Sequence, residues 1–118
     1  MICYPVPLTA AAFRELDRAV KRDGHCWKEL TSWLSKGVAQ VWSISGHAYV
    51  LTLANEDEEI EVLLAGGERA KECVGPWEAA MRAHPAHRGK TLRIEGRKGW
   101  SRLLKHWDRR DGVLYLKV

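Results

Sequence analysis

The chain has 118 residues, of which 46% are hydrophobic and 29% charged, and its formal net charge at pH 7 is +4. These proportions exclude wholesale disorder, and the length is typical of one core, so we expect residues 1–118 to form a single domain. No apolar run approaches the roughly 18 residues that span a bilayer, and the start lacks a basic, apolar leader, so we expect no membrane span and no secretion.

The first third of the chain favours two helices. Thr9 is a good N-cap for a helix over residues 10–22, and Gly24 and Gly37 are typical of residues that follow a helix. The first helix has an apolar stripe at helical spacing: Phe13, Leu16 and Val20. The second helix is short and is indicated by a similar stripe: Trp27, Leu30, Trp33 and Leu34.

The middle of the chain favours strands. Residues 38–45 (VAQVWSIS) and 48–54 (AYVLTLA) are rich in strand formers and are separated by a gap that suits a hairpin. A charged turn then leads to a third strand over residues 60–65, which Gly66-Gly67 ends. We therefore expect an antiparallel meander of three strands.

The last third alternates helices and strands. A helix is predicted to begin at Gly75-Pro76. One face of it would hold Trp77, Ala80, Met81 and His84. After strand 91–95 comes a second helix, with a stripe of Trp100, Leu103, Leu104 and Trp107, and then strand 113–118. The segment from strand 60–65 to strand 91–95 forms a βαβ crossover, which makes those two strands parallel neighbours. The predicted fold class is α/β (α+β): a mixed, mostly antiparallel sheet with one parallel crossover and helices on both faces.

The tail RIEGRKGWSRLLKHWDRRDGVLYLKV, within residues 91–118, resembles small phage-encoded proteins of the GNAT (N-acetyltransferase) fold, and the order of elements is also similar to that fold. The opening YPVPLTAAAFRELDRAV is faintly similar to the first strand and helix of an acetyltransferase. The resemblance implies a GNAT-like domain, localisation in a virion or in the host cytoplasm, and other phage or host proteins as partners. Such proteins often occur near virion or genome-ejection genes without demonstrated chemistry.

The coenzyme loop of an acetyltransferase has a characteristic pattern. Gln or Arg is followed by two residues, Gly, one residue, and Gly or Ala, so that bare backbone N–H groups meet the pyrophosphate of coenzyme A. The corresponding stretch here is LAGGERAK, in which Gly66 and Gly67 are adjacent and Glu68 adds a negative charge. We therefore expect no cofactor. The alternative, in which acetyl-CoA binds, would use Gly66 and Gly67 as a small backbone nest for an anion.

No catalytic residue is assigned. Glu59, Glu61 and His47 are candidates for a general base near the parallel strands, but an acidic run is usually solvated. Tyr115 is a candidate general acid by analogy with many acetyltransferases, although packing on its strand explains it equally well. His84 and His87 are spaced like a metal pair, and His25-Cys26 adds further ligand atoms elsewhere, but no third ligand has suitable spacing, so no metal site is predicted.

The three cysteines, Cys3, Cys26 and Cys73, are widely spaced and form no Cys-x-x-Cys pair. This arrangement indicates neither a disulfide framework nor a zinc ribbon, and we expect reduced side chains that act as small apolar fillers. The six tryptophans lie mostly on apolar stripes, so we expect most of them in the core and one or two at the rim of an interface.

The last third of the chain is basic. Residues 82–118 hold 11 lysines and arginines against 3 acidic residues, a balance of +8, which leaves −4 for residues 1–81. In Gly96-Arg97-Lys98-Gly99 the glycines suit a sharp strand-to-helix turn that Trp100 anchors, without any ligand. The other interpretation is a cationic surface for a partner or nucleic acid: Arg97, Lys98, Arg102, Lys105, Arg109 and Arg110.

The sequence leads to three hypotheses on function. The first is a non-catalytic phage structural or binding protein of GNAT-like fold, linked to virion assembly or genome ejection. The alternative is a divergent N-acetyltransferase that depends on acetyl-CoA. A second alternative is a nucleic-acid-binding or host-inhibiting accessory protein that uses the basic last third of the chain.

Overall fold

The computed structural model describes residues 1–95 and 99–118. The helices are α1 (Ala10–Asp23), α2 (Trp27–Ser35), α3 (Ala70–Ala83) and α4 (Gly99–Leu103), with a short 3₁₀ helix over Pro85–His87. The strands are β1 (Cys3–Val6), β2 (Ala39–Ile44), β3 (Ala48–Ala54), β4 (Glu59–Gly67), β5 (Thr91–Glu95), β6 (Asp108–Arg110) and β7 (Val113–Lys117). Across the described ranges, no helix is both long and apolar enough to cross a membrane.

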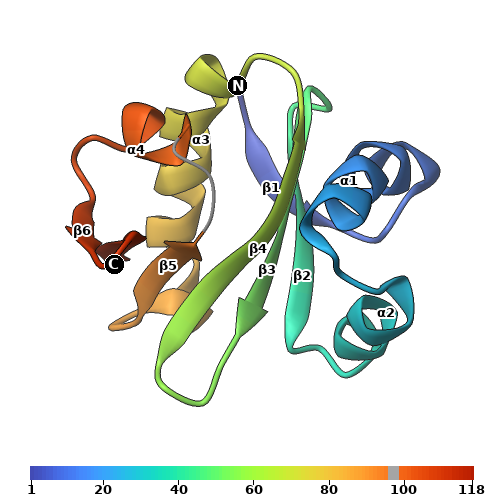
Figure 1. Ribbon diagram of the computed structural model, residues 1–118, viewed down its shortest axis with the longest axis horizontal. Helices are drawn as coiled ribbons and strands as arrows, with labels where there is room; N and C mark the ends of the chain where they lie inside the picture. Colours follow the sequence, from blue (N-terminus) through green and yellow to red (C-terminus); the bar gives the residue numbers. More distant parts are fainter. Residues whose placement is uncertain (96–98) are drawn as a thin grey trace.

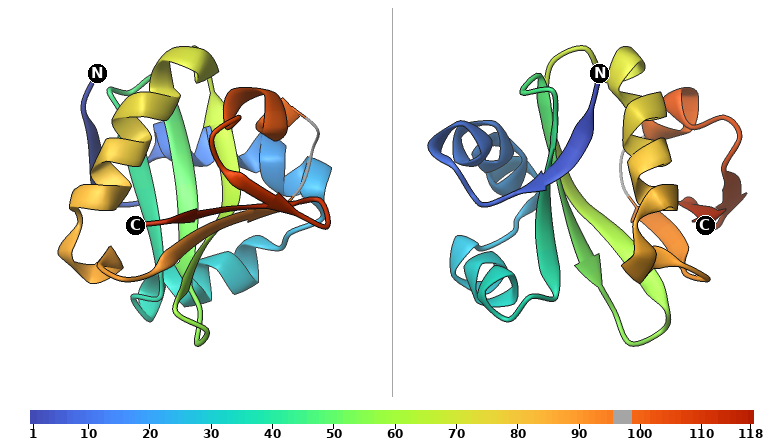
Figure 2. Two further views of the ribbon diagram at one scale, coloured as in Figure 1. Left: turned by 90° about the vertical axis from the view of Figure 1, so that its left-hand side faces the viewer. Right: turned by 180° about the vertical axis from the view of Figure 1, so that it is seen from behind.

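The described strands form one seven-stranded sheet in the order β1-β2-β3-β4-β5-β7-β6. Only the β4–β5 pair is parallel; every other pair of neighbours in the described sheet is antiparallel. Helices α1 and α2 lie on one face, and α3 and α4 lie on the other (Figures 1 and 2). The predicted mixed sheet with one parallel crossover and helices on both faces is confirmed.

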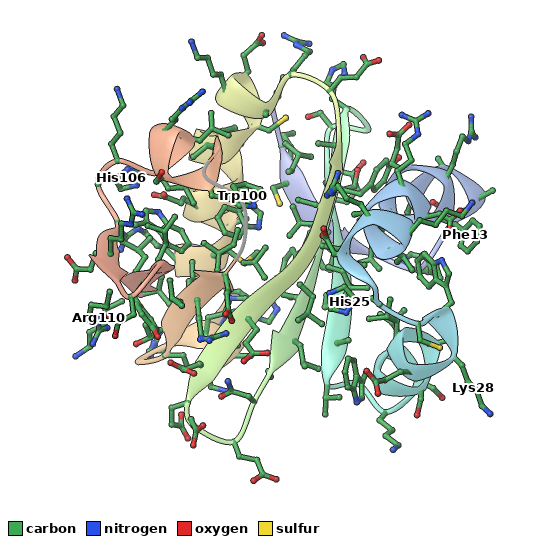
Figure 3. The ribbon with its side chains drawn as sticks, in the orientation of Figure 1. Phe13, His25, Lys28, Trp100, His106 and Arg110 are labelled. Carbon is green, nitrogen blue, oxygen red and sulfur yellow. The ribbon has the colours of Figure 1, made fainter. Side chains whose placement is uncertain are left out.

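On one face of the sheet, α1 and α2 form where the sequence predicts two helices. Thr9 Oγ1 accepts a hydrogen bond from the Ala12 N–H at 3.1 Å, which caps α1. Leu16 of α1 and Leu30 of α2 are fully buried against the sheet. Phe13 belongs to the same stripe by spacing but is 43% exposed, and its ring lies 4.7 Å from that of Trp27 on the outer surface (Figure 3).

On the face of the sheet that α3 and α4 cover, the structure differs from the prediction at the start of α3. Helix α3 begins at Ala70, five residues before Gly75, so Pro76 lies inside the helix. Proline removes one backbone donor there and would normally end the helix. The helix continues because a stripe at every fourth residue buries its side chains on the sheet: Cys73, Trp77 and Met81.

The end of the chain also differs from the prediction. Helix α4 stops at Leu103, so the predicted stripe is only partly helical, yet Leu104 and Trp107 are buried from the turn that follows. The short strands β1 and β6 were not among the predicted strands. Strand β1 pairs with β2, and β6 with β7, so each exists because a partner strand supplies its hydrogen bonds.

Strand β4 contains a β-bulge beside the cavities that are described below. The register between β3 and β4 shifts once and leaves Leu63 without an opposite residue. Leu63 and Leu64 therefore both pack toward α1 and α2, whereas Val62 and Ala65 contact the cluster beneath α3. The parallel pairing with β5 ends here as well, at Val62 opposite Ile94.

Candidate functional site

A cavity of about 410 Å³ lies where β5 leaves β4. Its walls come from β2, β3, β4, α3, β5 and α4, and they are mainly apolar. Its lining residues include Val62 and Ala65 of β4, Trp77 of α3, Ile94 of β5 and Trp100 of α4, of which Figure 3 labels Trp100. This volume is within the range of small-ligand sites, so we call it the central cavity.

A second cavity of about 520 Å³ lies toward the α1–α2 side of the same opening. The two cavities share four lining residues: Val62, Ala65, Ile94 and Trp100. The second cavity is more polar, because His25, Glu61 and Arg93 also line it. A cavity therefore lies on each face of the sheet at the point where β4 and β5 part. The cavity on the α3 side is mainly apolar, and the cavity on the α1–α2 side carries charged residues.

Gly66 and Gly67 both line the central cavity, as the acetyl-CoA alternative requires. Close backbone contacts within the protein also explain why both residues are glycine. A Cβ atom added at Gly66 would lie 2.4 Å from the backbone oxygen of Glu15 in α1, and one added at Gly67 would lie 2.4 Å from the backbone oxygen of His47. The fold therefore needs glycine at both positions, whether or not a ligand binds there.

The N-terminus of α3 opens beside these glycines and already holds an ion pair. Arg69 is the N-cap, in the left-handed conformation, and its guanidinium binds the Glu72 carboxylate and lies 3.2 Å from His47 Nε2. The hydrogen bonds from Arg69 hold the pKa of Glu72 below its ordinary value. Glu68 adds a further exposed carboxylate. Because the Arg69 guanidinium is already paired with Glu72 and Glu68 adds a negative charge, this helix end offers a bound anion little net attraction.

The candidate general bases are not brought together at the central cavity. His47 lies at the hairpin between β2 and β3 and contacts Arg69, whereas Glu59 lies at the opposite end of β4 and accepts a hydrogen bond from Asn55. Glu61 pairs with Arg93 at 3.5 Å and lines only the second cavity. Tyr115 lines neither cavity; its ring packs under the Arg110 guanidinium at 4.2 Å, which agrees with a packing role.

The thiols near the cavity are poor nucleophiles. Burial, together with the neighbouring Cys73, raises the pKa of Cys3 to about 11. Burial also raises the pKa of Cys73, which lines the central cavity. All three cysteines are free, as expected, but Cys26 is exposed and fills no core space, so the predicted filler role is wrong for it. Thiolate chemistry is therefore disfavoured at this site.

His84 and His87 lie at the end of α3 and contact each other, with ring centroids 4.7 Å apart. His87 is buried and its Nδ1 lies 3.0 Å from the Met81 carbonyl oxygen, so that nitrogen carries the proton. Within the described ranges no group of three metal-ligating side chains forms. His87 instead acts as a neutral core residue that packs against Trp42.

This burial predicts a pH dependence of stability. Burial lowers the pKa of His87 below its ordinary value of 6.5, and the nearby His84 and Lys90 lower it further. The unfolded chain then binds the proton more readily than the folded one, so stability should be complete above about pH 6.5 and should fall as the pH drops toward the folded-state pKa. Urea midpoints at pH 7.5 and 5.5 should differ more for the wild type than for His87→Asn. Equal differences would contradict the assignment.

The basic surface can be described only in part. Arg97 and Lys98 lie outside the described residues. Arg102, Lys105, Arg109 and Arg110 are exposed on α4, on the turn after it and on β6. Figure 3 labels Arg110 and His106, which lie on the side of the molecule formed by α4 and β6. Nucleic-acid binding through the tail stays a prediction.

Two features of the site are not indicated by the sequence. Glu78 of α3 accepts a hydrogen bond from Trp107 Nε1 at 2.6 Å and also contacts His106, which fixes the tail to α3. Trp77 Nε1 is a buried side-chain donor without a hydrogen-bond partner in the part of the chain that the structure describes. The apolar stripe predicts that the Trp77 ring is buried, but no sequence pattern shows whether its N–H finds an acceptor.

Comparisons of the chain with protein families, with curated proteins and with solved structures give no match. The resemblance to GNAT proteins and the functions that it implies therefore stay predictions. The observations that bear on function are the two cavities and the residues that line them.

Proposed function

We propose that the protein is a non-catalytic, phage-encoded binding protein of GNAT-like fold, whose central cavity accepts an apolar group of a partner protein. One observation carries this proposal: the described lining of the central cavity is apolar and offers no side chain suited to acid–base work. Its titratable members are Tyr49, which packs in the cluster on the other face, the exposed Glu68, and Cys73, whose pKa is raised by burial. General acid–base catalysis needs a group with a pKa near the working pH and within reach of the substrate.

The sheet supports the GNAT-like part of the proposal. An antiparallel meander leads through a parallel β4–β5 crossover to a final helix and strands, which is the order that the resemblance implies. The phage origin and the link to virion assembly or ejection rest on the similarity of the tail within residues 91–118. The neighbouring genes test that part directly: portal and tail genes would support it, and a host operon would contradict it.

The proposal predicts that coenzyme A derivatives do not bind. Isothermal titration of the protein with acetyl-CoA and with free coenzyme A should give no binding at micromolar concentrations, because Glu68 and Glu72 lie where the pyrophosphate would approach α3. A circular dichroism spectrum of the same sample controls for folding. Micromolar binding of either compound would overturn the non-catalytic proposal.

The second candidate is a divergent N-acetyltransferase. It is favoured by the position of the central cavity, which lies between two diverging parallel strands and beside the start of α3. In that function Gly66 and Gly67 would face the coenzyme. Transfer of a radiolabelled acetyl group from acetyl-CoA to an amine would support it, and no transfer across a broad panel of amines would count against it.

A further inference from the structure

Three sulfur-containing side chains meet where the N-terminal segment lies beside α3 (Figures 1 and 2). The Sγ of Cys73 on α3 lies 3.8 Å from the Sδ of Met1. Ile2 extends the pairing of β1 with β2, because its carbonyl oxygen accepts a hydrogen bond from the Ser45 N–H at 2.8 Å. Residues two apart in an extended segment point to the same side, so Cys3 faces α3 together with Met1. Cys3 also packs on the core cluster that contains Cys73, and we call Met1, Cys3 and Cys73 the sulfur cluster.

The spacing and the chemistry of these sulfur atoms suit one soft metal ion. Two sulfur atoms that each lie about 2.3 Å from the same ion, at tetrahedral or trigonal angles, are about 3.8–4.0 Å apart. The Met1 Sδ and the Cys73 Sγ already have that separation. Thiolate and thioether ligands together favour Cu(I). Zn(II) usually takes four ligands from Cys, His, Asp and Glu, and the described ranges hold no group of three such side chains.

The charges near the sulfur cluster suit a bound monovalent cation. Burial, and then the nearby Cys73, raise the pKa of Cys3 to about 11, and burial is also the main cause that raises the pKa of Cys73. Arg69 and the N-terminal ammonium oppose that rise at Cys73, whereas Glu72 adds to it. Arg69 and Glu72 form an ion pair and largely cancel. The ammonium group therefore lies where it would offset the single negative charge that two thiolates and one Cu(I) leave.

We propose that Met1, Cys3 and Cys73 form a binding site for one Cu(I) ion, which is held by two thiolates and one thioether. On binding, the S–H bonds of both cysteines break, three Cu–S bonds form, and two protons pass to solvent, while copper stays in the Cu(I) state. A coordinated metal ion deprotonates a thiol outright, so a raised pKa keeps the free thiols unreactive without excluding the metal. The inference goes beyond the proposed function and does not rest on it.

The sulfur cluster offers an entry path for the ion. Met1 is 42% exposed and Cys3 is partly exposed, whereas Cys73 is buried at the base of the cluster. An incoming ion would therefore meet the thioether first. The methionine side chain has several rotatable bonds and adapts its position easily, which lets it close over an ion already bound to the two thiolates. The bound ion would tie the segment before β1 to α3.

The first experiment titrates the reduced protein with Cu(I) in the absence of oxygen and in the presence of the coloured Cu(I) chelator bicinchoninate. The wild type should take a single equivalent of Cu(I) from the chelator and should gain the ultraviolet charge-transfer band of Cu(I)–thiolate bonds. Cys3→Ser and Cys73→Ser should each bind Cu(I) about a hundredfold or more weakly, because each loses a ligand. Cys26→Ser removes the exposed cysteine on the other side of the sheet and, as the matched control, should keep the wild-type affinity.

The second experiment identifies the thioether ligand and needs no cysteine variant. X-ray absorption at the copper edge, on Cu(I)-loaded protein grown with selenomethionine, should show one selenium and two sulfur neighbours within bonding distance of copper. Met81 is the other methionine of the chain, and it is fully buried about 12 Å along α3 from Cys73. Met81→Leu, which conserves volume, should therefore leave the selenium neighbour in place. Circular dichroism of each variant checks that it folds.

Several results would overturn the inference. They are complete retention of Cu(I) by bicinchoninate, a loss of affinity in Cys26→Ser as large as in the two cluster variants, and a copper spectrum without a selenium neighbour. The last result decides the matter even if Cys3→Ser and Cys73→Ser fail to fold. Failure of the copper site would leave the proposed function as it stands, whereas micromolar binding of coenzyme A would overturn the proposed function and leave the copper site untouched.

Discussion

Gly67→Ala should lower the free energy of unfolding by about 3–5 kcal/mol, because two costs combine at this position. Gly67 has a φ of +130°, which L-residues with a side chain rarely adopt. An added Cβ would also lie 2.4 Å from the His47 carbonyl oxygen and 2.5 Å from the Ala48 Cα. Both atoms belong to the backbone beside β3, and they cannot move away without breaking the β3–β4 pairing. Urea unfolding followed by circular dichroism measures the loss.

Two other glycines serve as controls. Gly24 has a φ of +75° but nothing within 4 Å of an added Cβ, so Gly24→Ala should lose only about 1 kcal/mol. Gly75 lies inside α3 and directly precedes Pro76, whose ring disfavours the helical conformation for a preceding residue with a Cβ, so Gly75→Ala should lose about 1 kcal/mol or less. If Gly67→Ala lowers the free energy of unfolding no more than Gly24→Ala does, Gly67 does not lie as close to the His47 and Ala48 backbone as the structure shows.

Trp107→Ala should cost about 3–5 kcal/mol, which is typical when a large buried aromatic side chain is removed. Trp107 is 5% exposed, and its ring stacks on Trp77 with centroids 5.9 Å apart. Its loss also removes the indole donor from the Glu78 carboxylate, which is itself mostly buried. Thermal and urea unfolding of the variant should both show the loss.

Trp100→Ala is the matched comparison. A buried Trp100 would have the same large cost, but the structure places this side chain half-buried between the two cavities, so we expect about 1–2 kcal/mol. Glu78→Gln keeps a hydrogen-bond acceptor for Trp107 and should cost less than Trp107→Ala. A Trp100→Ala variant that is as unstable as Trp107→Ala would show that the opening between β4 and β5 is packed shut.

Elements with local signals could be predicted closely. Strands 48–54 and 91–95 have the predicted bounds, and the first helix has the predicted cap at Thr9 and the predicted glycine end at Gly24. Each depends on residues next to one another in the chain: strand formers between turn residues, or a cap before an apolar stripe. Such signals need no knowledge of the partner element.

Elements that depend on distant partners were missed or displaced. Strand β1 contains Pro5, which suits an edge strand but weakens the local strand signal, and β6 consists of the charged residues Asp108–Arg110. Helix α3 begins before Pro76 because its buried stripe outweighs the proline. Gly66 and Gly67 end β4 rather than follow it, since β3 pairs with them up to Ala48.

The site was predictable in its location but not in its shape. The βαβ crossover indicates that strands near residues 60–65 and 91–95 are parallel neighbours, and the structure confirms that pairing. The central cavity depends on the bulge at Leu63 and on the point where the pairing of β5 with β4 ends. The pattern of apolar residues in the sequence predicts neither feature. Packing alone decides that the Trp77 indole N–H meets no acceptor among residues 1–95 and 99–118.

The place of β7 between β5 and β6 sets the order in which the sheet can be completed during translation. β7 leaves the ribosome after every other described strand, yet it supplies the antiparallel partner of β5 from Thr91 to Glu95. Until then β5 has only its short parallel pairing with β4, which closes a long loop and forms slowly. The nascent chain should therefore leave the backbone N–H and C=O groups on one edge of β5 without a strand partner until synthesis has passed Lys117, and a stall before that point should leave a chaperone substrate.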